Sequence, residues 1–308
     1  MTIPVLSLRS LDRDAFADAI GASFRRYGFA MVADHGMDEA LVRDGWAAAQ
    51  ALFALPDETK RRYIVPGGLG QRGYTAFGVE TAKGADQSDL KEFWHVGRDL
   101  PPGSPLAATM PPNIWPEELP DFAATMRALY AAFDSIGNRI LSAIAVHIGL
   151  SPDWFDPAVA DGNSVLRLLH YPPVAPKASG IRAGAHEDIN LITLLLGAEE
   201  AGLQLLTREG EWIDVAPPPE ALVVNVGDML QRLTNHALPS TSHRVVNPPV
   251  QRAAVSRYSM PFFLHLRPDF LIEPLEQCVS DANPARYPPV TADAYLIERL
   301  TEIGLIKA

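Results

Sequence analysis

The residues of this 308-residue chain best suited to chemistry are two histidines and an aspartate. His186 and Asp188 lie two positions apart, and His243 follows 57 positions after His186. Two imidazoles and one carboxylate suit a divalent iron ion and leave coordination positions open for reactants. Side chains two apart on a β-strand point to the same face. We therefore predict that His186 and Asp188 bind one metal together and that His243 arrives from a different strand.

The ligand types argue against most other metals. Structural zinc usually takes four ligands rich in cysteine, and this chain has one cysteine, Cys278. Calcium takes mostly oxygen ligands. The stretch from His186 to Asn190 departs from the His-Glu-x-x-His pattern of zinc proteases. Catalytic zinc, which two histidines and a carboxylate can hold, stays open on these residues alone.

A second pair, Arg257 and Ser259, shares one strand face by the same two-residue rule. A guanidinium fork binds a carboxylate through two parallel hydrogen bonds, and a serine hydroxyl can add a third. On chemistry alone the pair can therefore bind the carboxylate of a small acid, but the better reading of a lone arginine is the alternative, a surface salt bridge.

One glycine motif is excluded as a nucleotide site. The segment from Gly68 to Gly73 fits Gly-x-Gly-x-x-Gly. A dinucleotide site needs a strand before this motif and a helix opening inside it. The following residues, Tyr74 to Gly78, are poor helix formers. We interpret the segment as a glycine-rich loop near the mouth of an active site.

The elements that must position these residues change character along the chain. From residue 164, short apolar runs separated by Pro, Gly and Asn predict an antiparallel sandwich or barrel. These runs are Val165 to Leu169, Ile189 to Leu196, Leu203 to Leu206, Ala221 to Val226, and Arg257 to Leu264.

Helical periodicity precedes and follows these strands. Apolar residues recur every three or four positions from Phe122 to Ile148, which predicts a long helix near 121–149. Seven prolines between residues 101 and 120 predict an irregular connector. Near the N-terminus, two short strands should flank a helix that carries Phe16, Ile20 and Phe24. A C-terminal helix is predicted within 288–308, with these residues on one face: Tyr295, Leu296, Leu300 and Ile303.

Several ordered stretches extend the pattern over nearly the whole chain: Ile3 to Leu6, Tyr27 to Phe29, Asp34 to Gly36, Phe53 to Pro56, Asn113 to Pro116, His170 to Pro173, His186-x-Asp188, Asn225 to Asp228, His243 to Val245, and Arg257-x-Ser259. Together they resemble the isopenicillin N synthase-like branch of the Fe(II)/2-oxoglutarate-dependent dioxygenases. The resemblance implies an α+β fold with a double-stranded β-helix (jelly-roll) core and flanking helices.

The resemblance also implies an organisation along the chain, as one compact catalytic unit. An N-terminal dioxygenase-type segment (1–95) packs on the core, and a proline-rich connector with the long helix follows (96–160). The jelly-roll catalytic core spans 161–270, and a helical extension spans 271–308.

The implied activity is that of an Fe(II)/2-oxoglutarate-dependent oxidoreductase. It couples oxidative decarboxylation of 2-oxoglutarate to hydroxylation, desaturation or cyclisation of a small-molecule substrate, with dioxygen as oxidant. By resemblance, Arg257 and Ser259 grip the distal carboxylate of 2-oxoglutarate, and Tyr171 donates to this cosubstrate. Plant members often carry asparagine where this chain has Leu169. No catalytic residue is expected beyond the metal centre, because iron and cosubstrate carry the hard chemistry.

Other readings share these residues. Isopenicillin N synthase and aminocyclopropane-carboxylate oxidase do not use 2-oxoglutarate, and an ethylene- and succinate-forming enzyme consumes it as substrate. A non-catalytic jelly roll that binds a small acid or a metal is the alternative from a different class. Fold-level analogy does not separate them.

Composition limits the partners. The net charge of -11 disfavours phosphate backbones and anionic membranes. No obligate protein partner is inferred. A single cysteine and the lack of a signal-peptide pattern indicate a cytoplasmic protein. Five polar or aromatic residues are candidates for the pocket rim: Asp34, His35, Tyr74, Trp94 and His95. Each of them could instead serve packing.

Overall fold

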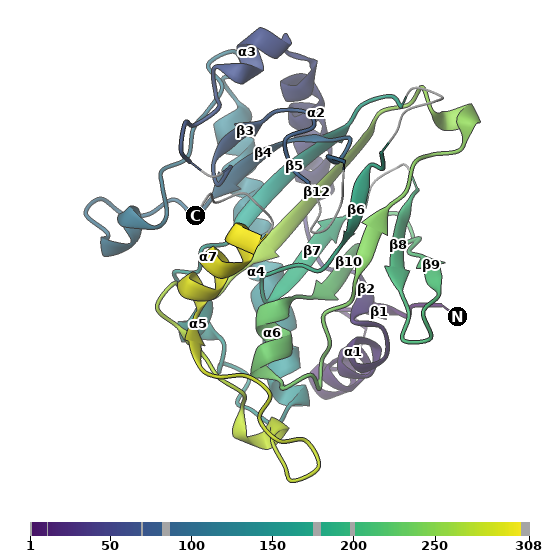
Figure 1. The fold of residues 1–308 in the computed structure, drawn as a ribbon, viewed down its shortest axis with the longest axis vertical. Coiled ribbons are helices and arrows are strands. Elements are labelled where there is room, and N and C mark those ends of the chain that lie inside the picture. Colours follow the sequence, from purple (N-terminus) through teal and green to yellow (C-terminus); the bar gives the residue numbers. More distant parts are fainter. Residues whose placement is uncertain are drawn as a thin grey trace.

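A computed structural model of the protein describes residues 2–10, 12–68, 70–81, 87–174, 180–197 and 201–302. Its core is built from two sheets (Figure 1). The strands of the larger sheet are β1 Val5–Ser7, β2 Phe29–Ala33, β3 Gly73–Thr75, β4 Glu92–Gly97, β5 Val165–Tyr171, β7 Ile192–Leu196, β10 Leu222–Val226 and β12 Arg257–Leu264. The strands of the smaller sheet are β6 Ala183–His186, β8 Leu203–Leu206, β9 Trp212–Asp214 and β11 His243–Val245.

The larger sheet has the order β1-β2-β10-β7-β12-β5-β4-β3, and the smaller has the order β6-β11-β8-β9. All strand pairs in them are antiparallel except β1 with β2. A separate hairpin joins β13 Leu271–Ile272 to β14 Val290–Thr291. This arrangement with its flanking helices confirms the predicted α+β jelly-roll fold.

Seven α-helices and three 3-10 turns lie within the described residues. The α-helices are α1 Arg13–Tyr27, α2 Glu39–Ala54, α3 Asp57–Arg61, α4 Phe122–His147, α5 Asp156–Val159, α6 Asp228–Leu233 and α7 Ala292–Glu302. The 3-10 turns are η1 Pro105–Ala108, η2 Val250–Arg252 and η3 Glu276–Cys278. In this part of the chain no helix is both long enough and apolar enough to cross a bilayer.

The larger sheet is buried on both faces, because alternate side chains of a strand point to opposite sides. On β12, Phe262 and Leu264 join the core formed with the helices, where Phe262 stacks on Phe133 of α4 at a ring-centroid distance of 5.5 Å. Arg257 and Ser259 therefore point to the opposite side, toward the smaller sheet. The polar pair thus faces the space between the sheets.

The N-terminal segment contributes strands at both edges of the larger sheet: β1 and β2 at one edge, β3 and β4 at the other. β2 pairs with β10, and β4 pairs with β5. Helices α1 and α2 pack on α4, which contacts β7 and β12. The boundaries at 95, 160 and 270 stay a prediction, although strands from before residue 100 and after residue 164 share one sheet.

Most of the predicted elements are present, with small differences in their ends. The long helix appears as α4, and the proline-rich connector holds only η1 among regular elements. Strand β3 begins at Gly73, the last residue of the glycine motif, which is consistent with the exclusion of a dinucleotide site. Leu69 of the motif lies outside the described residues. Ile303 of the predicted C-terminal helix also lies outside them.

Candidate metal centre

The structure brings the three predicted ligand residues together from two strands of the smaller sheet. His186 is the last residue of β6, His243 is the first of β11, and the two are paired across the antiparallel ladder. The Nε2 atoms of both histidines lie 3.9 and 3.8 Å from Oδ1 of Asp188. One ligand atom from each residue lies within 4.8 Å of the others. This donor set fits a divalent iron ion bound through two imidazoles and one carboxylate.

Asp188 reaches this point differently from the prediction. β6 ends at His186, so Asp188 lies in the segment between β6 and β7 and not within a strand. Its position is held by its backbone, since the Asp228 N–H donates to the Asp188 carbonyl at 2.7 Å. The ligand atoms of His186 and Asp188 still lie within 4.8 Å of each other, so the two-residue spacing brings both side chains to one point.

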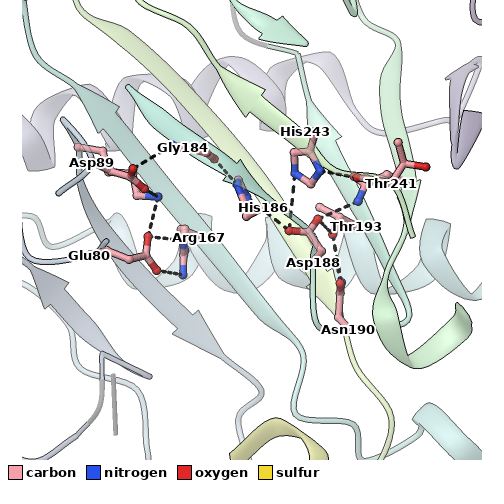
Figure 2. Close-up of polar contacts among 12 residues, drawn as sticks. Glu80, Asp89, Arg167, Gly184, His186, Asp188, Asn190, Thr193, Thr241 and His243 are labelled. Atoms are coloured by element: carbon pink, nitrogen blue, oxygen red, sulfur yellow. Dashed lines mark hydrogen bonds and ion pairs between the residues drawn. The ribbon is translucent and has the colours of Figure 1, made fainter. Parts of the chain in front are cut away.

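Hydrogen bonds on the far side of each ligand set its orientation (Figure 2). Nδ1 of His186 donates to the Gly184 carbonyl at 2.8 Å, and Nδ1 of His243 donates to the Thr241 carbonyl at 3.1 Å. A backbone carbonyl only accepts, so in each ring Nε2 carries the lone pair that a metal needs. Both rings therefore present Nε2 toward Asp188.

Asp188 is bound at one oxygen and presents the other. Its Oδ2 accepts from Thr193 Oγ1 at 2.5 Å and from Asn225 Nδ2 at 2.8 Å. The Oδ1 atom is the one that faces both histidines. Thr193 was not predicted from the sequence as part of the site; its pairing opposite Asn225 on adjacent strands is what brings both donors to one carboxylate.

The protonation states agree with metal binding. Burial would raise the pKa of Asp188, but the facing histidines and the hydrogen bonds from Asn225 and Thr193 hold it below its ordinary value. Burial and the neighbouring His243 lower the pKa of His186 to about 4. The carboxylate is therefore charged and His186 is neutral at physiological pH, as ligation requires.

The predicted carboxylate-binding pair lies on the inner face of the larger sheet. Arg257 and Ser259 are buried on β12, opposite Tyr171 and Leu169 of β5. The Arg257 guanidinium lies over the Tyr171 ring, 5.0 Å from its centroid. The structure thus places Tyr171 against Arg257, in a position to share a ligand with it.

A cavity of about 740 Å³ opens beside the three metal-ligand candidates, with His186 and Asp188 in its wall. The described residues that line this cavity do not include Arg257, Ser259 or Tyr171. The cavity is therefore the candidate space for a substrate, and the proposed carboxylate-binding pair lies outside its described lining.

The proposed rim residues divide among three places. Tyr74 and His95 line the cavity beside the metal-ligand candidates. Asp34 and His35 line a separate groove beside α2. Trp94 is fully buried in the core, so its role is packing.

Charged residues of the cavity wall were not predicted from the sequence. Lys91 and Arg167 are largely buried there and form ion pairs with Glu80. The sequence does carry a signal for them: Arg167 lies within β5 and Lys91 directly precedes β4, where the residues of a purely structural buried strand would be apolar.

Comparison with known proteins assigns the class. Residues 162–266 match the model of the 2OG-Fe(II) oxygenase superfamily, and residues 3–118 match that of the non-haem dioxygenase in morphine synthesis N-terminal family. A 2-oxoglutarate-Fe(II) type oxidoreductase from Aspergillus fumigatus is 33% identical over 281 residues, which cover 88% of this chain and 82% of that protein.

Two solved structures extend this similarity. A 2OG-Fe(II) oxygenase family protein from Caulobacter crescentus has 55% identity and a TM-score of 0.91, covering 98% of this chain and 99% of that one. A full-length Neurospora crassa protein, solved in complex with alpha-KG and thymine, has 30% identity and a TM-score of 0.86, covering 97% and 96%.

The chain belongs to the 2OG-Fe(II) oxygenase superfamily. Its activity is that of an Fe(II)/2-oxoglutarate-dependent dioxygenase, with Fe(II) as metal and 2-oxoglutarate and dioxygen as cosubstrates. The predicted family, fold, enzyme class and cofactors are thereby confirmed.

Proposed function

We propose that His186, Asp188 and His243 are the iron ligands of this dioxygenase. The observation that supports this assignment is the convergence of their three ligand atoms within 4.8 Å. The hydrogen bonds at the far side of each ligand support it further, since they direct Nε2 of both rings and Oδ1 of the carboxylate toward one point.

Arg257 and Ser259 are the proposed binding residues for the distal carboxylate of 2-oxoglutarate. Both are buried and share the face of β12 that points between the sheets. Tyr171 lies under the Arg257 guanidinium and is proposed to contact the same cosubstrate. A buried guanidinium gains most from a fully charged partner, because water does not screen the pair there.

Bound Fe(II), with 2-oxoglutarate and dioxygen, supplies the oxidising power that the side chains lack. The protein residues hold the reactants in place. When iron is bound, Nε2 of His186, Nε2 of His243 and Oδ1 of Asp188 would hold it, and the cavity beside them would take a small molecule for hydroxylation, desaturation or cyclisation.

Three finer assignments accompany this proposal. The ordered motifs support membership of the isopenicillin N synthase-like branch. The net charge of -11 supports a small-molecule substrate with no nucleic acid, membrane or obligate protein partner. The single cysteine, which cannot form a disulfide within the chain, supports a cytoplasmic location.

The direct test is spectroscopic. Anaerobic addition of Fe(II) and 2-oxoglutarate to the metal-free protein should produce a visible metal-to-ligand charge-transfer band. Substitution His186→Ala should remove the band together with iron binding. If iron binds at full stoichiometry and no band appears, the proposed chelation of 2-oxoglutarate at this metal is wrong.

A further inference from the structure

Charged side chains in the cavity wall form a second cluster beside the metal centre. The Arg167 cluster, as we define it, consists of Glu80, Asp89, Lys91, His95 and Arg167, all of which line the cavity of about 740 Å³. Nζ of Lys91 donates to Glu80 Oε2 at 2.6 Å and to Asp89 Oδ2 at 2.8 Å. Figure 2 shows the side chains of Glu80 and Arg167 facing one another.

The Arg167 guanidinium is fixed on several sides. Its Nε donates to His95 Nε2 at 2.6 Å, and His95 Nδ1 donates to the Gly70 carbonyl at 2.5 Å. His95 must therefore be a neutral imidazole, with its one ring proton on Nδ1. The guanidinium lies over the ring of Phe93, 4.2 Å from the centroid, and over that of Phe263, at 5.2 Å. Few rotamers satisfy all of these contacts, so the group is preorganised.

The Glu80–Arg167 pair lines the cavity and keeps hydrogen-bonding capacity that its contacts with the described residues do not use. Oε2 of Glu80 accepts from Lys91 and, at 3.3 Å, from Nη1 of Arg167. Oε1 accepts from Nη2 at 3.4 Å, and among the described residues it has no further donor. The contacts of Arg167 with His95 and Glu80 use three of the five N–H groups that a guanidinium carries. Nη2 and Oε1 thus form a donor beside an acceptor.

The cluster as a whole carries no surplus charge. Burial would raise the pKa of Glu80, but Arg167 and Lys91 hold it well below its ordinary value. Burial would lower the pKa of Lys91, but Glu80 and Asp89 keep it raised. Burial and the Arg167 charge hold the pKa of His95 well below 6.5. Two cations therefore balance two carboxylates, and an anionic substrate would gain little net attraction here.

The aromatic ring of Phe263 lies between the Glu80–Arg167 pair and the metal-ligand candidates. Phe263 pairs with Thr193 across β12 and β7, and Thr193 donates to Asp188. The ring of Phe263 lies under Arg167 and lines the same cavity. A flat molecule resting on Phe263 would therefore have one edge toward Arg167 and Glu80 and another toward the metal-ligand candidates.

We infer that Arg167 and Glu80 are specificity-determining residues for a small, uncharged, planar cyclic amide, whose carbonyl accepts from Nη2 of Arg167 and whose adjacent N–H donates to Oε1 of Glu80. This inference rests on the proposed function, because it places the ring beside the proposed iron ligands. A cyclic amide presents its carbonyl and N–H on the same edge, whereas a carboxylate and a tertiary amide have no donor there.

The substrate class is tested with purified enzyme, Fe(II) and 2-oxoglutarate. Uracil and 2-pyridone should stimulate succinate formation above the substrate-free rate. N-methyl-2-pyridone, which lacks the N–H, and benzoate, which is an anion, should not. Stimulation by benzoate alone, or by none of the four compounds in an enzyme that shows the charge-transfer band, would overturn the inference. Absence of that band in the same preparation would instead count against the proposed function.

The residue roles are tested with Arg167→Lys and Glu80→Gln. Each should raise the KM for the stimulating amide by about 10-fold or more, because Arg167→Lys loses the planar guanidinium with its Nη2 donor and Glu80→Gln replaces the charged acceptor with a neutral amide. Both should retain the charge-transfer band. The matched controls are Arg98→Lys and Asp134→Asn, which alter a partly buried ion pair of 3.0 Å between Arg98, directly after β4, and Asp134 of α4. These should leave the KM unchanged. An unchanged KM in a folded Arg167→Lys enzyme would refute the role of Arg167.

Discussion

His243 lies directly opposite His186 in the antiparallel pair of β11 and β6, with the two ring centroids 4.4 Å apart. Cross-strand neighbours have their Cβ atoms about 5 Å apart, which is close enough for both rings to reach one metal ion. The register of this pair thus decides whether a site exists. A slip of one residue would turn one histidine to the opposite face of the sheet.

Removal of one of these histidines should abolish iron binding. In His243→Ala, only one imidazole and one carboxylate remain as protein ligands, so we expect loss of iron-dependent succinate formation. Anaerobic titration of Fe(II) measures the effect directly. The control is His236→Ala, whose ring contacts Tyr287 away from the centre and which should bind iron normally. Full activity of His243→Ala would refute the ligand assignment.

Thr193 should matter for iron affinity although it is not a ligand. Thr193→Val keeps the shape of the side chain but removes the 2.5 Å hydrogen bond to Asp188 Oδ2. Loss of such an orienting partner typically weakens metal binding about 10- to 100-fold. Thr109→Val, at an exposed position, is the matched control and should not change the Kd for Fe(II). An unchanged Kd in Thr193→Val would show that Asn225 alone suffices to orient the carboxylate.

Substitution of Arg257, the proposed 2-oxoglutarate-binding residue, should change the KM for this cosubstrate. Arg257→Lys retains the charge and loses the planar fork, so the KM for 2-oxoglutarate should rise roughly 10- to 100-fold. The iron affinity should not change. Arg244→Lys is the control, since Arg244 binds Gln204 and lies over Trp212. An equal effect on iron affinity and on KM would contradict a role confined to the cosubstrate.

Because His265 is buried, we expect the free energy of unfolding to decrease in acid. Burial lowers its pKa from 6.5 to about 4, and the charge of Asp188 acts in the opposite direction. Between these values the unfolded state binds a proton that the folded state does not, so the free energy of unfolding should fall as pH drops from 6.5 toward 4. The full effect is on the order of 3 kcal/mol.

Denaturation of the metal-free protein at pH 7.5 and pH 4.5 measures this loss. In His265→Gln the part of the loss due to this ring should disappear, whatever the stability of the variant at pH 7.5. An equal pH dependence in both proteins would show that His265 takes no part in it.

The helix-facing side of β12 should control stability more than chemistry. Phe262 is fully buried and stacks on Phe133, so Phe262→Ala should lower the free energy of unfolding by about 3–5 kcal/mol. Phe77→Ala, at a half-exposed position, should cost less than about 1 kcal/mol. Chemical denaturation measures both. A loss below about 1 kcal/mol for Phe262→Ala would mean that the core refills the space.

Local patterns in the sequence were sufficient for many elements. The apolar stripe from Phe122 to Ile148 specifies α4 because its period matches a helix that is buried along one side. The β12 alternation, with Phe262 on one face and Arg257 on the other, likewise follows from a period of two. Helix α2 was missed because two of its four buried residues, Gly45 and Ala49, are small and mark the buried face only weakly; the other two are Leu52 and Phe53.

The sequence by itself determined which residue types could bind iron, since the chemistry of two imidazoles and a carboxylate does not depend on the fold. Only the tertiary structure decided which oxygen of Asp188 faces the histidines, through donors from Thr193 on β7 and Asn225 on β10. It also decided that Glu80 and Arg167, 87 positions apart, meet in one cavity wall. The reason is physical: such contacts depend on strand register and sheet order, which arise from packing between segments distant along the chain and leave no local periodicity.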